Sequence, residues 1–277
     1  MDFGEFKIFA LSAGTMRLDG GAMFGVVPRT VWEKTNPPDE KNRILIGLNA
    51  LLIKTPVHNI LVDPGIGDKN DDKFRLRYCL DGENALSGPL NKAGLTQDDI
   101  TVVINTHLHF DHAGGNTTLD SGALRPAFRN ARYVVQRGEL DAALNPNERT
   151  RASYRPEDFV PVKDAGLFDL LDGDGDVTEG VSVFRAPGHN RDIQMVKVES
   201  RGNKAVFLSD TIPTVSHLRY PYIAGYDLFP LETLKVKKEI IEKAAAQRWL
   251  FVFFHEPRHA MGYVSIADGE PLFEKIS

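Results

Sequence analysis

The sequence has little of three things that would have pointed to other kinds of protein. Only one cysteine, Cys79, occurs among 277 residues, which excludes an intramolecular disulfide and suits a reducing compartment. No apolar run approaches the roughly 18–20 residues of a membrane span. There is no surplus of positive charge, since the net charge is -5 and the pI is near 5.9, and this argues against a nucleic-acid partner. We therefore expect no nucleic-acid partner and no membrane partner.

The composition is that of an ordinary globular protein. Hydrophobic residues make up 42% of the chain and charged residues 26%, and a chain of this length buries a sizeable core. The segment 1–7 lacks the charged-then-apolar layout of a signal peptide. We therefore expect a cytoplasmic protein with a small-molecule substrate, and the sequence leaves a homodimer open.

What the sequence does contain is a dense group of histidines. His107, His109 and His112 fall within six residues, together with Asp111, and they are three of only eight histidines in the chain. The apolar run 102–104 precedes them, so a strand ending there would carry all four side chains into a loop at one sheet edge. Neutral imidazole is a good ligand for zinc and neighbouring metals, and a carboxylate is its natural partner. The pattern predicts a metal site on a rigid support.

Three residues further along the chain have the same position relative to an apolar run. His189, Asp210 and His255 each stand where such a run gives way to a loop. Together with the first group they make seven potential ligands, more than the four of a closed structural zinc site. This excess favours an open catalytic site over a binding domain that a metal merely stabilises. Asp63, which precedes a turn, is predicted to orient a ligand instead of binding the metal.

The predicted strands and helices do not alternate strictly. Strands are expected at 50–54, 59–62, 101–105, 132–136, 181–185, 195–199, 205–208 and 249–254, and helices at 86–93, 139–144 and 231–247. The polar, proline-bearing segment 145–161 is expected to form a long loop or flap. Two packed sheets flanked by helices suit this order better than one doubly wound parallel sheet.

The ordered set His-x-His-x-Asp-His, Gly-His, Asp and His resembles the metallo-β-lactamase superfamily of metal-dependent hydrolases. The segment 61–65, Leu-Val-Asp-Pro-Gly, is similar to the strand and turn that precede the metal motif in that family. The resemblance spans most of the chain. It implies an α+β fold, an αββα sandwich of two mixed sheets with helices outside, formed as a single domain over residues 1–277.

The resemblance also implies a dinuclear metal centre. Seven side chains would bind two divalent ions. The first ion would be bound by His107, His109 and His189, and the second by Asp111, His112 and His255. Asp210 would bridge the two ions. Zinc is the first expectation, and iron, manganese and cobalt also suit such ligands. Two ions can activate one hydroxide against a carbonyl or phosphoryl group. Asp111 would accept a proton and later deliver it to the leaving oxygen.

Three segments resemble a quorum-quenching group within the superfamily, the N-acyl-homoserine lactone lactonases. These segments are 20–28 (GGAMFGVVP), 107–115 (HLHFDHAGG) and 222–230. Met23 and Phe24 would line a pocket for the acyl chain, and His217 is a further candidate for contact with the substrate. The resemblance thus predicts hydrolytic opening of an acyl lactone.

Two positions depart from the lactonase pattern. Pro213 stands where some lactonases carry a tyrosine that polarises the lactone carbonyl, and Tyr226 is the candidate to replace it. Ile193 stands where many members have a second histidine that is not a ligand. A phosphotriesterase of the methyl-parathion-hydrolase kind is therefore the alternative, because it uses the same metal site. A thioesterase acting on glutathione conjugates is less favoured, because no basic cluster for that anionic tail is evident.

Overall fold

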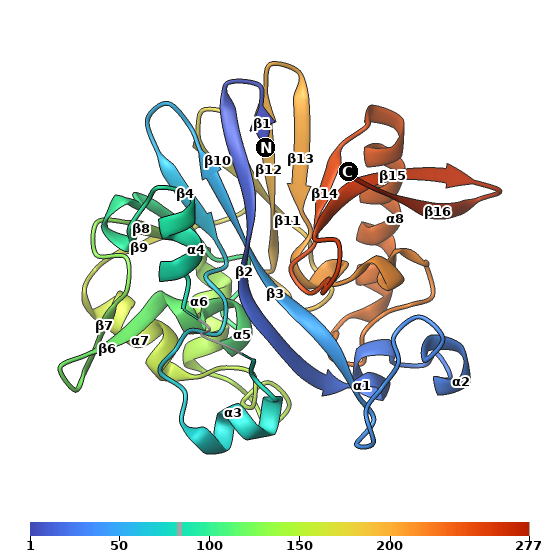
Figure 1. Cartoon of the computed structure of the whole chain (residues 1–277), viewed down its shortest axis with the longest axis horizontal. Coiled ribbons are helices and arrows are strands. Elements are labelled where there is room, and N and C mark those ends of the chain that lie inside the picture. Colours follow the sequence, from blue (N-terminus) through green and yellow to red (C-terminus); the bar gives the residue numbers. More distant parts are fainter. Residues whose placement is uncertain (82–84, 277) are drawn as a thin grey trace.

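The computed structural model describes residues 1–81 and 85–276. In it, two seven-stranded sheets pack against each other, the first formed by the earlier part of the chain and the second by the later part (Figure 1). Their strand orders are β1-β2-β3-β4-β5-β8-β9 and β10-β11-β12-β13-β14-β15-β16, and β6-β7 forms a separate hairpin. The strands are β1 Asp2–Phe3, β2 Phe6–Asp19, β3 Arg43–Lys54, β4 Asn59–Val62, β5 Val102–Ile104, β6 Thr117–Asp120, β7 Ala123–Pro126, β8 Arg132–Gln136, β9 Phe168–Leu171, β10 Gly175–Thr178, β11 Val181–Arg185, β12 Gln194–Ser200, β13 Asn203–Phe207, β14 Leu250–Val252, β15 Met261–Ala267 and β16 Glu270–Lys275.

Most helices lie on the outer sides of the two sheets, and the short helices within 20–32 and 72–78 lie near one end of the long strands β2 and β3 (Figure 1). The α-helices are α1 Gly20–Phe24, α2 Arg29–Trp32, α3 Asp72–Tyr78, α4 Ser87–Lys92, α5 Phe110–Ala113, α6 Arg137–Leu144, α7 Pro156–Asp164 and α8 Pro230–Gln247. The 3-10 helices are η1 Gln97–Asp99, η2 Gly114–Asn116, η3 Ser209–Thr211 and η4 Val215–Leu218. Within the described ranges, none of the helices has the length and apolar character needed to cross a membrane. The predicted sandwich of two mixed sheets with outer helices is confirmed.

The core lies between the sheets. One apolar cluster contains side chains of both sheets, including the fully buried Ile46, Val196 and Phe207. A second cluster joins the outer face of the second sheet to α8, where Ile241 and Phe251 are both fully buried. Burying apolar surface in this way is the main favourable contribution to folding, about 25 cal/mol per Å². The two clusters hold the sheets in the fixed relation on which the site depends.

Strand direction brings the loops of the two sheets to one edge. β4, β5 and β8 run parallel in the first sheet, and β13 and β14 run parallel in the second. Backbone hydrogen bonds also join the sheets there, because the amides of Gly47 and Asn49 donate to the carbonyls of His255 (2.9 Å) and Phe254 (3.0 Å). The carboxyl ends of β5, β13 and β14 therefore meet.

Segment 145–161 was predicted wrongly as loop throughout. Helix α7 begins at Pro156 and buries Phe159 and Val162. Proline at the first helical position followed by Glu157 and Asp158 is a helix-start signal, and Pro161 within the helix obscured it. Only the first part of the segment is a loop, and that part reaches the site described next.

Candidate metal centre and active site

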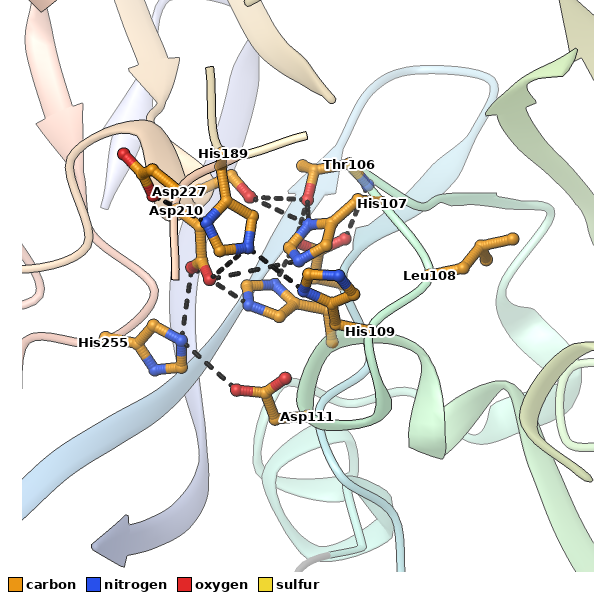
Figure 2. Close-up of polar contacts among 12 residues, drawn as sticks. Thr106, His107, Leu108, His109, Asp111, His189, Asp210, Asp227 and His255 are labelled. Atoms are coloured by element: carbon orange, nitrogen blue, oxygen red, sulfur yellow. Dashed lines mark hydrogen bonds and ion pairs between the residues drawn. The ribbon is translucent and has the colours of Figure 1, made fainter. Parts of the chain in front are cut away.

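The predicted ligands converge at the edge where the carboxyl ends of the strands meet (Figure 2). The motif 107–112 follows β5, and His189 follows β11. Asp210 and His255 follow the parallel strands β13 and β14. Each side chain is thus delivered by a strand end in the core, which restricts its movement more than a surface loop would.

Asp210 lies between the two groups of ligands. Its Oδ1 is 3.1 Å from Nε2 of His112 and 3.2 Å from Nε2 of His255. Its Oδ2 is 3.4 Å from Nε2 of His189 and 4.0 Å from Nε2 of His107. Each carboxylate oxygen therefore faces a different group, which is the arrangement that a bridging ligand requires.

The donor atoms form two compact sets, each within 4.8 Å of one another: His107, His109, His189 and Asp210; and Asp111, His112 and His255. In the first set, Nδ1 of His109 is 3.1 Å from Nε2 of His189. Two nitrogens bound to one tetrahedral zinc ion lie about 3.3 Å apart, given bonds of about 2.0–2.1 Å. In the second set, Oδ2 of Asp111 is 3.4 Å from Nε2 of His255. The spacing suits two first-row metal ions.

The outward nitrogens of three histidines fix the tautomer of each ring. In each case Nδ1 contacts a carboxylate or carbonyl oxygen, so in the neutral ring that binds a metal Nδ1 carries the proton and Nε2 has its lone pair directed inward. The acceptors are Oδ2 of Asp63 for His112 (2.8 Å), Oδ1 of Asp227 for His189 (2.9 Å) and the carbonyl of Gly47 for His255 (3.0 Å).

Asp63 also joins the ligand loops of the two sheets through Thr106. Its Oδ1 accepts from the Thr106 amide at 2.7 Å and its Oδ2 from the Thr106 hydroxyl at 2.6 Å. That hydroxyl can then accept from Nδ1 of His107 (3.1 Å) and from the hydroxyl of Ser209 (2.6 Å). Asp63 and Ser209 both have φ of 49°, a left-handed conformation that costs a non-glycine residue about 1 kcal/mol or more. The predicted orienting position of Asp63 agrees with these contacts.

The chemistry of the donor set fits two divalent cations. Nε2 of His107 is buried without a hydrogen-bond partner among the described residues, a costly state for a polar atom. Desolvation and the neighbouring imidazoles lower the pKa of both His107 and His109 well below the ordinary value, so these rings are neutral as metal binding requires. Two divalent ions would also balance the charge of the four carboxylates in and around the cluster: Asp63, Asp111, Asp210 and Asp227.

A cavity of about 210 Å³ opens onto the cluster. Five of the candidate ligands line it: His109, Asp111, His189, Asp210 and His255. The rest of the lining includes the apolar residues Leu18, Met23, Phe110 and Leu228 and the polar residues Tyr78, Arg149, Thr150, Ser153 and Tyr226. A cavity that combines the candidate metal ligands with both polar and apolar lining residues suits a small ligand with one polar and one apolar part.

Tyr226 is one of the polar residues that line the cavity, and 39% of its surface is exposed. Burial, together with the charges of Asp19 and Asp111, raises the pKa of Tyr226 to about 12. The phenol therefore keeps its proton at neutral pH, and its hydroxyl is available as a hydrogen-bond donor in the cavity.

Of the residues predicted to contact a substrate, only Met23 and Tyr226 line the cavity. Phe24 is fully buried and stacks between Trp32 and His217, with ring centroids 5.2 Å and 4.8 Å away. His217 is 1% exposed, and both of its ring nitrogens are occupied by other protein groups. The prediction of direct contact is therefore corrected for Phe24 and His217, which lie one layer behind the wall.

Two buried carboxylates at the site were missed from the sequence. Asp227, beside the predicted Tyr226, bonds to His189 and accepts from the hydroxyl of Thr233 at 2.7 Å. Glu139 accepts from the Leu108 amide (2.8 Å), within the histidine motif, and from the Tyr154 hydroxyl (3.0 Å). The residues next to Asp227 and Glu139 in the sequence do not indicate these contacts. Asp227 lies 38 residues from His189, and Glu139 lies 31 residues from Leu108.

Comparison with known proteins agrees with this geometry. The family model of the metallo-beta-lactamase superfamily matches residues 46–255. An N-acyl homoserine lactonase of Bacillus thuringiensis is 30% identical over 206 residues, which cover 69% of this chain and 75% of the relative. A probable metal-dependent hydrolase from Staphylococcus aureus has 30% identity and a TM-score of 0.92, covering 100% of this chain and 99% of its own.

A more distant structure shows similarity of fold. AidC, a dizinc quorum-quenching lactonase solved with its product N-hexanoyl-L-homoserine, has 20% identity and a TM-score of 0.83, and the match covers 100% of this chain and 96% of that one. The matched range 46–255 starts in β3 and ends at His255, so it contains all seven candidate ligands. The chain belongs to the metallo-beta-lactamase superfamily and is a hydrolase related to the N-acyl homoserine lactonases.

Proposed function

We propose that this protein hydrolyses the lactone ring of N-acyl homoserine lactones at a centre of two divalent ions, with zinc as the first candidate. The observation that carries the proposal is the cavity, which is lined both by residues of the two ligand sets and by the apolar side chains of Leu18, Met23, Phe110 and Leu228. An acyl lactone has the matching parts, an ester ring to react and a hydrocarbon chain to bury. The relatedness to N-acyl homoserine lactonases supports the same substrate class.

The residues of the site would have the following roles. His107, His109 and His189 would hold one ion, Asp111, His112 and His255 the other, and Asp210 both. When bound, such ions lower the pKa of water and polarise a carbonyl group. Asp63 and Asp227 keep His112 and His189 in the tautomers that bind metal.

Lactone opening adds the elements of water across the ester bond. A water oxygen bonds to the carbonyl carbon, the bond from that carbon to the ring oxygen breaks, and the ring oxygen leaves as an alcohol. Asp111 lines the cavity, so its carboxylate can accept the proton from water and return it to the departing oxygen. The Tyr226 hydroxyl can donate a hydrogen bond to the carbonyl oxygen as negative charge develops there.

The test is parallel turnover of two substrates by metal-replete protein. N-hexanoyl homoserine lactone should be opened to the hydroxy acid, with a mass gain of one water, and an aryl phosphotriester should be hydrolysed far more slowly. Brisk phosphotriester hydrolysis without lactone turnover at any acyl length from four to twelve carbons would overturn the proposal in favour of the alternative.

Replacing Tyr226 by phenylalanine tests the donor role. Tyr226→Phe should lower kcat for the lactone by about tenfold or more, because a donor to a developing oxyanion is lost, while KM changes little. Tyr263→Phe, on β15 away from the cavity, serves as the matched control. An unchanged kcat in Tyr226→Phe would remove this residue from the mechanism.

A further inference from the structure

Lys237 is a buried lysine whose three donors all bind one loop. Its Nζ donates to the carbonyls of His217 (3.0 Å), Arg219 (3.0 Å) and Tyr222 (2.6 Å), and the residue is 1% exposed. Burial lowers the pKa of Lys237 to about 7, so an ammonium here costs stability. An apolar side chain at this position in α8 would avoid that cost but would leave the three carbonyls without this donor. What the lysine contributes is the conformation of residues 217–222.

That loop in turn presents His217 to the cavity wall. Nε2 of His217 lies 2.8 Å from the carbonyl of Met23, and Nδ1 lies 2.8 Å from the hydroxyl of Thr214. Burial, opposed by the Met23 carbonyl, lowers the pKa of His217 to about 3, so the ring is neutral. Because a carbonyl can only accept, the proton sits on Nε2, and Nδ1 accepts from Thr214. Both bonds are therefore satisfied by one tautomer.

Met23 depends on such outside support. It lies in α1, a helix of five residues, which is too short to be stable by itself. Its side chain lines the cavity, while its carbonyl is held by His217 and the following ring, that of Phe24, stacks on His217 with an interplanar angle of 5°. Lys237 in α8 thus supports the position of Met23 in the cavity wall through residues 217–222, which are not among the residues that line the cavity.

We propose that Lys237 and His217 are positioning residues that fix Met23 in the cavity wall and thereby set the preference of the enzyme for the length of the acyl chain. The inference rests on the proposed lactonase function. It predicts that variants of His217 and Lys237 lose more kcat/KM the longer the acyl chain of the lactone is. The reason is that Met23 would contact the apolar part of the substrate and lies outside the ligand sets.

Two His217 variants provide the first test. His217→Phe keeps a ring against Phe24 but loses both hydrogen bonds. The ratio of kcat/KM for the decanoyl lactone to that for the butanoyl lactone should fall by about fourfold or more, the contribution of one buried methylene. His217→Gln places an amide donor where Nε2 stands and should restore the ratio to within about twofold of wild type. An unchanged ratio in His217→Phe would overturn the proposal.

Lys237→Leu should give the same loss of chain-length preference, with Lys235→Leu on the exposed side of α8 as its control. The ¹³C-methyl NMR signal of Met23, assigned through Met23→Leu, gives a readout that needs no substrate. It should shift or broaden in His217→Phe and in Lys237→Leu, and stay in place in Lys235→Leu. If wild-type protein opens no lactone, the proposed function fails, and this signal alone decides the positioning role. A Met23 signal identical in all variants would refute that role.

Discussion

Asp210→Asn is expected to lose at least ~10²-fold in lactone turnover and to retain only one of two metal equivalents. The carboxylate has one oxygen directed at each ligand set, at 3.1 Å and 3.2 Å on one side and 3.4 Å and 4.0 Å on the other. Asparagine has the same shape, but it offers only one oxygen and removes a negative charge. Its amide would turn an N–H donor toward one set, where a cation should sit.

Metal content and kcat measured on the same preparation check this expectation. Asp164→Asn is the control, since the Asp164 side chain is 66% exposed at the end of α7. Wild-type turnover with two ions per chain in Asp210→Asn would show that Asp210 does not bridge. Loss of activity with both ions retained would point to a role in the reaction other than binding metal.

The clustering of the candidate metal ligands could be predicted from sequence because their signal is local. Each follows an apolar strand directly, and the structure brings the motif 107–112, His189, Asp210 and His255 to one sheet edge. Strand direction alone makes such residues neighbours, without knowledge of packing. Of the carboxylates behind the ligands, Asp63 was predicted from the turn that it precedes, whereas no role was predicted for Asp227, which lies 38 residues from its partner His189.

The side chains around the cavity show most clearly what could not be predicted from the sequence. Met23 and Phe24 are adjacent apolar residues with the same sequence signal, yet Met23 lines the cavity and Phe24 stacks behind it on His217. Which of them faces the cavity depends on the rotation of a five-residue helix. That rotation is set by contacts with distant segments, and these are fixed only when the whole chain has folded.

In the fold, most of the long strands β2 and β3 could likewise not be predicted from the sequence. Only the end of β3 was predicted, at 50–54, although the strand runs from Arg43 to Lys54 and pairs with nearly all of β2. In β2 the register shifts between Ser12 and Thr15, and Gly14 has φ of 96°. This bulge interrupts the two-residue alternation by which a strand is recognised in sequence. Pairing with β3 stabilises the strand in spite of it.

Removal of the metal ions is expected to abolish lactone turnover and to lower the melting temperature by about 8 °C or more. An ion present at a thousand times its dissociation constant stabilises the folded state by about 4 kcal/mol, and each kcal/mol moves the midpoint of a chain this size by about 2 °C. In metal-free protein, Nε2 of His107 would have no partner in a buried site, and the nearby carboxylates would repel one another.

Chelation followed by titration with zinc, manganese, cobalt or iron measures this effect. Activity and melting temperature should both recover, and recovery should be complete at two equivalents per chain, because the candidate ligands include two compact sets with Asp210 between them. Full recovery of both quantities at one equivalent would contradict the dinuclear centre. Recovery of stability at one equivalent and of activity only at the second would instead agree with it, since one filled set already satisfies buried donors, whereas the reaction requires both.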